Sequence, residues 1–136
     1  MSPTQRISLL IVKKPRTEDL NEHMQWFSHS LGLFGERDKE RSCFRIFIEL
    51  VKSNQQHRPL TSDQLASRAH LSRGTVIHHL NKLMDQGLVI PQGKCYILKV
   101  RSLTLLVDSV EMEMKSIFKD LRDEARRLDE ELHLDN

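Results

Sequence analysis

The chain has 136 residues, of which 38% are hydrophobic and 29% charged, and its formal net charge is +2. This length suits one domain with at most one appended element, and the composition is that of a protein with much exposed helix. The longest apolar stretch, residues 7–12, is too short to cross a bilayer and no cleavage site follows it, so we expect a cytoplasmic protein.

The charge is distributed unevenly along the chain. Residues 1–101 contain 16 Lys and Arg against 9 Asp and Glu, whereas residues 102–136 contain 5 against 10. Within residues 52–101, Asp63 and Asp85 are the only acids among 8 basic residues. A basic block beside an acidic tail predicts that one part of the protein contacts a polyanion. Charge alone supports an alternative equally well, namely a solvated surface whose charge is unevenly distributed.

The first region, residues 1–36, is predicted to be an N-terminal arm followed by a helix. The stretch 7–12 is typical of a short strand or a packed arm, and Pro15 ends it. Thr17 is the predicted N-cap of the helix that follows. One face of this helix carries apolar residues at steps of three and four, namely Leu20, Met24, Phe27, Leu31 and Phe34.

The middle region, residues 37–101, is predicted to contain three helices and a hairpin. The first helix runs from about residue 37 to 54. Thr61 and Gln64 form a capping box for a short second helix, and Ser72 caps a third that ends near Gln86, before Gly87. Residues 88–90 and 95–100 are predicted strands, joined by a tight turn at Gly93.

The last region, residues 102–136, is predicted to be one long helix that pairs with a second copy as a coiled coil. Its apolar stripe comprises Leu103, Val107, Val110, Met114, Ile117 and Leu121, and after a slip of one residue it continues through Ala125, Leu128 and Leu132. Pairing would bury side chains that one helix leaves exposed. The alternative is that this helix folds back on the Leu20–Phe34 face.

This order of elements predicts a mainly helical protein with a small β-hairpin wing: a winged helix-turn-helix with a long C-terminal dimerisation helix. Residues 1–36 form the arm and helix, residues 37–101 the DNA-binding domain, and residues 102–136 the dimerisation helix. A helix of this kind fits the major groove, and residues near its N-terminus reach base edges.

The third helix of the middle region has two faces of different chemistry. Its apolar stripe, which must face the core, contains Val76, Ile77, Leu80, Leu83 and Met84. The predicted DNA-binding residues are Ser72, Arg73, Gly74, Thr75, His78, Lys82 and, at the hairpin tip, Lys94. Arg73 can hold guanine by two hydrogen bonds, Thr75 and Ser72 can bond bases or phosphates, and Gly74 allows close approach. Lys82 and Lys94 are expected on phosphates.

Residues 71–89, LSRGTVIHHLNKLMDQGLV, resemble the recognition helix and strand entry of ArsR-type repressors, and the segment also resembles the winged helix-turn-helix of MarR-type regulators. The resemblance implies a homodimer that binds a near-palindromic operator and controls transcription, associated with the nucleoid. Thiol-sensing ArsR-type members carry a Cys-x-Cys pair where this chain has Thr61 and Asp63, so a soft-metal site of that kind cannot form here.

Other functions fit the sequence less well. Cys43 and Cys95 form no CxxC pair and are predicted to be ordinary packed thiols, and no metal or cofactor is expected. The sequence shows no nucleophile with a base, no phosphate-binding loop and no carboxylate pair, so none of these features indicates an enzyme. The expected partners are double-stranded DNA and a second copy, with no membrane and no identifiable small-molecule effector. The alternative is a winged helix that binds proteins in a larger assembly.

Overall fold

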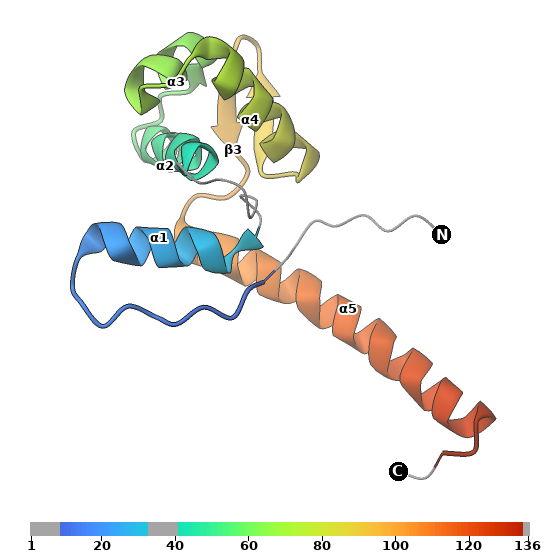
Figure 1. Ribbon diagram of the computed structural model, residues 1–136. Helices are drawn as coiled ribbons and strands as arrows, with labels where there is room; N and C mark the ends of the chain where they lie inside the picture. The colour runs from blue at the N-terminus through green and yellow to red at the C-terminus, as the bar shows by residue number, and fades with distance from the viewer. Residues whose placement is uncertain (1–8, 33–40, 135–136) are drawn as a thin grey trace. The chain divides into compact units, whose positions relative to one another are not determined.

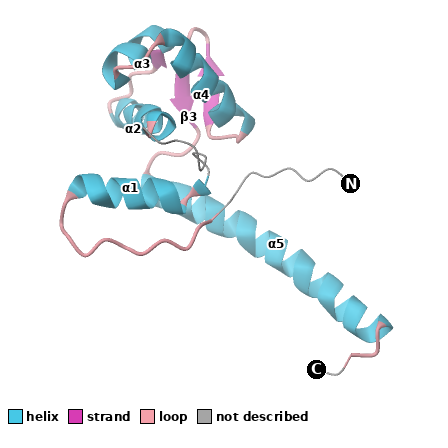
Figure 2. Ribbon diagram, viewed as in Figure 1, coloured by secondary structure: helices cyan, strands magenta, loops and turns pink. Residues whose placement is uncertain are grey.

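The computed structural model describes residues 9–32 and 41–134. It divides into two compact units, the first ending at Arg101 and the second beginning at Ser102. The described residues form helices and one small antiparallel sheet (Figures 1 and 2), so the predicted fold class is confirmed. The start of the predicted arm, Phe34 and residues 37–40 of the predicted second helix lie outside the described residues.

Helix α1 (Leu20–Ser30) follows the N-terminal arm. Its N-cap is Asp19, whose carboxylate accepts a hydrogen bond from the Asn21 N–H at 3.1 Å. The predicted cap, Thr17, is wrong: its hydroxyl donates instead to the carboxylate of Glu22. Asp19 is the better cap because its negative charge lies directly at the positive end of the helix.

The described part of the arm packs back on α1. Leu9 forms an isolated antiparallel bridge with Leu31, and the indole Nε1 of Trp26 donates to the Val12 carbonyl at 3.0 Å. The ammonium of Lys14 lies 5.7 Å from the centre of the Trp26 ring. The sequence is compatible with a short strand or a packed arm in this region, and these contacts favour the packed arm.

Helix α2 (Ser42–Gln55) supplies most of the core. Its buried apolar side chains are Cys43, Phe44, Ile46, Phe47 and Leu50. It packs against two further helices, α3 (Ser62–Ala69) and α4 (Arg73–Asp85), and against the sheet. The apolar surface of α2 is broad because the helix has contacts on several sides. The Cys43 thiol is one of the core groups, as predicted from the sequence.

The helix-turn-helix is formed by α3 and α4. Thr61 and Gln64 make the predicted capping box at the start of α3, and the Ser72 hydroxyl caps α4. Between them, His70 takes the left-handed conformation at φ 56° and ψ 47° and turns the chain. The Arg45 guanidinium of α2 donates to the carbonyl of Ala69, which holds the end of α3 against α2.

The sheet has three short antiparallel strands in the order β1-β3-β2. They are β1 (Leu60–Thr61), β2 (Val89–Gln92) and β3 (Cys95–Leu98). The hairpin of β2 and β3 is the predicted wing, with Gly93 at φ 62° in its turn. The strand β1 is not predicted from the sequence, because two residues are too few to show a periodicity.

The second unit is helix α5 (Leu103–Glu131), within the predicted span. Ser102 is its N-cap and accepts a hydrogen bond from the Leu105 N–H at 3.1 Å. From Ile117 onward the large residues of the apolar stripe are exposed: Ile117, Leu121, Leu128 and Leu132. None of the helices in the described part of the chain has the length and apolarity needed to cross a membrane.

Candidate nucleic-acid interface

Helix α4 separates its apolar and polar residues as the sequence predicts. Val76, Leu80 and Leu83 are fully buried, whereas Ile77 and Met84 are half-buried at the edges of the same stripe. Figure 1 shows α4 beside α3, with the strand β3 behind them. Burying this stripe against α2, α3 and β2 fixes the helix about its long axis, so that its other face is directed outward.

The outward face contains most of the predicted DNA-binding residues. Arg73, Gly74 and His78 are exposed, and Lys82 is half-buried. The rings of His78 and the adjacent His79 lie 5.4 Å apart and tilted by 60°. In the described residues, no group of three or more His, Cys, Asp and Glu side chains could hold a metal ion. The surface thus offers hydrogen-bond donors and positive charge.

The N-terminal end of α4 is organised by two hydroxyl groups. The Ser72 Oγ accepts a hydrogen bond from the Thr75 N–H at 3.2 Å and donates to the Thr75 Oγ1 at 2.8 Å. The cap therefore uses the hydroxyl hydrogen of Ser72, while the Thr75 hydroxyl hydrogen can still be donated to another molecule. The N-terminal end of a helix also favours an anion, because most N–H groups of its first turn have no partner within the helix.

An ion pair that the sequence analysis missed joins the two helices of the motif. The Arg73 Nε lies 3.5 Å from the Asp63 Oδ1, which connects the first residue of α4 to the first turn of α3. The two residues are ten positions apart in different helices, so no local pattern in the sequence indicates the contact. The pair places Arg73, which is predicted to bind guanine, next to Asp63, one of the two acidic residues in the segment 52–101.

The wing carries further basic side chains. Lys94 is exposed in the turn between β2 and β3, and Lys99 and Arg101 are exposed where the hairpin ends. Positive charge at these positions is suited to phosphates beside a groove occupied by a helix.

This arrangement defines a winged helix-turn-helix protein: a capped helix with a polar outward face, a preceding helix that supports it, and a basic hairpin beside it. Residues 49–90 match the sequence model of the family described as bacterial regulatory protein, arsR family. The match runs from the second half of α2 into β2 and confirms the ArsR-type resemblance. It supports a DNA-binding transcriptional regulator that acts on double-stranded DNA.

The other two comparisons add no relative. A search of curated proteins and a search of solved structures each found no significant match.

Proposed function

We propose that the protein is a homodimeric transcriptional regulator that reads double-stranded DNA in a sequence-specific manner, with α4 in the major groove and the wing on the flanking backbone. The observation that carries the proposal is the outward polar face of α4, which begins at a well-formed cap and ends near Lys82. An α-helix fits the major groove of B-DNA, where every base pair presents a distinct pattern of donors and acceptors.

The roles of the individual side chains follow from their positions on α4. Arg73 and His78 are exposed on the leading part of the helix and contact base edges. Thr75 donates its hydroxyl hydrogen to a base or a phosphate, and Ser72 orients Thr75. Gly74 has open space around its Cα, since a Cβ built there meets no atom within 4 Å, so it lets the DNA backbone or a base edge come close.

Two further residues position the protein on the sugar-phosphate backbone. Lys82 lies two to three turns along α4 from Arg73 and contacts a phosphate at the edge of the groove. Lys94 lies in the wing turn and contacts the flanking backbone. Contacts of this kind contribute affinity and register, whereas base contacts provide the sequence preference.

Dimerisation through α5 completes the proposal. Four exposed residues of the apolar stripe, Ile117, Leu121, Leu128 and Leu132, recur at spacings of four, seven and four. This spacing is close to the heptad repeat of a coiled-coil seam and supports pairing with a second copy. Two copies joined in this way present two recognition helices to two half-sites, as expected for a near-palindromic operator. The surplus of acids in residues 102–136 keeps this helix away from DNA, and the dimer acts in the cytoplasm on the nucleoid.

The proposal is tested by selecting bound duplexes from a random pool and measuring the affinity of the selected site as salt is raised. We expect a two-fold symmetric consensus sequence. We also expect the logarithm of the binding constant to fall linearly with the logarithm of the salt concentration, with a slope of about −0.9 per phosphate contacted. If the purified protein shows no preference among duplexes and no binding at low ionic strength, the proposal fails. The winged helix would then be a protein-binding module.

A further inference from the structure

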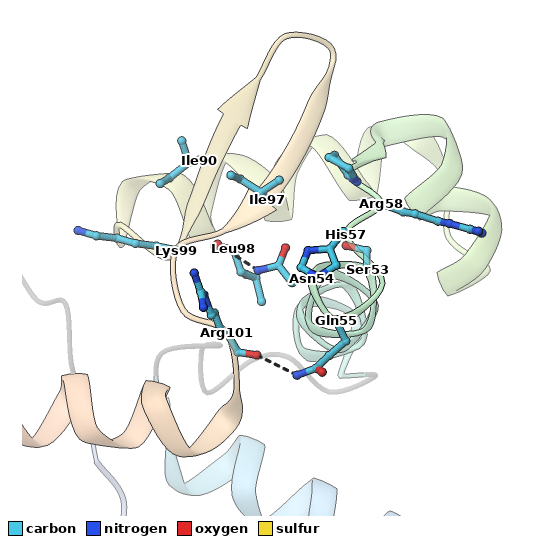
Figure 3. A pocket seen from close by; sticks show the side chains of 11 residues that line it. Ser53, Asn54, Gln55, His57, Arg58, Ile90, Ile97, Leu98, Lys99 and Arg101 are labelled. Atoms are coloured by element: carbon cyan, nitrogen blue, oxygen red, sulfur yellow. Dashed lines mark hydrogen bonds between the residues drawn. The ribbon is translucent and has the colours of Figure 1, made fainter.

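A groove of about 720 Å³ lies between the wing and the C-terminal end of α2. It is lined by the end of α2, the loop that leads to β1, and the strands β2 and β3 with the residues that follow (Figure 3). All these residues belong to the first unit. The volume is within the range of sites that hold small molecules, about 300–1,000 Å³.

The floor of this groove is apolar. Ile90 of β2 and Ile97 of β3 are directly paired across the hairpin. Their neighbours in the same strands, Val89 and Leu98, are buried in the core, so by the alternation of a strand the two isoleucines present their side chains on the outer face. Ile90 remains 42% exposed there. A paired apolar surface of this kind is unnecessary for a contact with phosphate alone.

The rim of the groove carries basic side chains. Arg58, Lys99 and Arg101 line it together with the imidazole of His57, and none of the described residues that line it is Asp or Glu. Across the described residues 9–32 and 41–134, no carboxylate lies within ion-pair distance of Arg58, Lys99 or Arg101. In Figure 3 the Arg101 guanidinium points toward the strands, while the Lys99 and Arg58 side chains extend outward from the rim. Arg101 is therefore the cation directed into the groove.

The backbone that carries Arg101 is held in place by α2. The Asn54 side-chain amide donates to the carbonyl of Leu98 at 3.2 Å and to that of Val100 at 3.5 Å. The Gln55 amide donates to the carbonyl of Arg101 at 3.4 Å (Figure 3). These bonds tie the end of α2 to the segment after β3, so the groove is formed before any ligand arrives, which lowers the entropic cost of binding.

We propose that this groove binds a small organic anion with an apolar body, such as an aromatic or medium-chain carboxylate. The carboxylate pairs with the Arg101 guanidinium, in the bidentate geometry that arginine favours. The hydrocarbon body covers the Ile90–Ile97 pair and removes it from water. Lys99 and Arg58 add positive potential at the rim that attracts an anion. The site is independent of the recognition face of α4.

The test titrates the full-length protein with 1-naphthoate, followed by the fluorescence of the ligand, with octanoate as an aliphatic competitor. Naphthalene-1-carboxamide keeps the apolar body without the charge, and inorganic phosphate keeps a charge without the body. We expect saturable binding of naphthoate, displacement by octanoate, and affinity lower by about tenfold or more for the amide and for phosphate.

Variants connect the binding to the groove. Arg101→Gln should lower naphthoate affinity by about tenfold or more, since a hydrogen bond to a charged group is lost. Ile97→Thr should also weaken naphthoate, because it exposes polar surface on the floor. Lys94→Gln changes an equally exposed cation of the same hairpin outside the groove and should bind naphthoate like the wild type. Circular dichroism and thermal melting confirm that each variant is folded.

Several results would overturn the proposal. They are no saturable binding of naphthoate or octanoate, equal binding of the carboxylate and its amide, or unchanged affinity in folded Arg101→Gln. A groove that serves only DNA phosphates would be shown by phosphate competing as well as octanoate, together with Arg101→Gln weakening duplex binding alone. Because naphthoate binding is measured without DNA, failure of the DNA-binding proposal leaves this test intact.

Discussion

The Arg73 Nε lies 3.5 Å from the Asp63 Oδ1, across the turn that joins the two helices of the motif. Their side chains are 72% and 74% exposed, so the pair contributes at most about 1 kcal/mol to stability. An exposed pair of this kind exchanges readily with solvent. We infer that a DNA phosphate or base competes with Asp63 for the guanidinium, so that Asp63 lowers the affinity for DNA.

Replacing Asp63 with Asn should therefore strengthen DNA binding several-fold at low salt, because it releases Arg73 and removes one negative charge from the protein surface near the duplex. Stability should change by less than about 1 kcal/mol, as for other exposed ion pairs. Fluorescence anisotropy with a labelled duplex at two salt concentrations measures the effect. Asp85→Asn, at the far end of α4, is the matched control, and an equal gain in both variants would show a general effect of charge.

Arg73 and Lys94 should differ in what they contribute to binding. Arg73→Ala should cost about 1–3 kcal/mol on the preferred site and relax the choice of one base, because a base contact is lost. Lys94→Ala should weaken all duplexes alike and reduce the slope of affinity against salt by about one phosphate. Titrations of each variant with the selected site and with random duplex measure both. Equal effects of Arg73→Ala on the two duplexes would contradict its role in base recognition.

Ser72 allows the stability of α4 to be separated from DNA binding. Ser72→Ala removes the hydroxyl that accepts from the Thr75 N–H, and should destabilise the protein by about 0.5–2 kcal/mol. Ser72→Asp keeps a good N-cap and adds a favourable charge at the helix N-terminus, so its thermal stability should stay near that of the wild type.

The same aspartate should nevertheless abolish tight DNA binding, since it places a negative charge where the proposed duplex lies. Thermal melts and duplex titrations of the two Ser72 variants measure both properties. Strong DNA binding by a stable Ser72→Asp protein would place the DNA elsewhere on the molecule.

The sequence predicted the features that depend on local chemistry. The capping box of Thr61 and Gln64 and the cap at Ser72 were found because a cap needs only residues within three positions. The choice of cap before α1 failed because Thr17 and Asp19 are both capable residues, and only the folded chain shows which one meets the helix N–H groups.

Features made by residues distant in sequence were missed for a different reason. The Arg73–Asp63 pair joins two helices, and β1 is two residues that become a strand only by pairing with β3. The groove beside the wing brings the end of α2 next to Arg101, a juxtaposition that no periodicity encodes. The family match over residues 49–90 covers the second half of α2, the helices α3 and α4, and the start of β2, and it supports the class of protein without identifying these contacts.

The proposed dimer gives the last prediction. Leu121 is 59% exposed on the apolar stripe of α5, and Met112 is 74% exposed on the opposite face of the same helix. Leu121→Glu places like charges in the centre of a paired seam, whereas Met112→Glu adds the same charge outside it. Leu121→Glu should therefore give a monomer by light scattering or sedimentation, and Met112→Glu should keep the mass of the wild type.

The monomer should retain weak binding to a single half-site, because α4 and the wing belong to the first unit, but should lose the gain that comes from linking two half-sites. Duplexes with one and with two half-sites distinguish these effects. Should both variants be monomeric or both dimeric, the seam lies elsewhere. Should Leu121→Glu be monomeric yet bind the full site as tightly as the wild type, dimerisation through α5 would have no part in recognition.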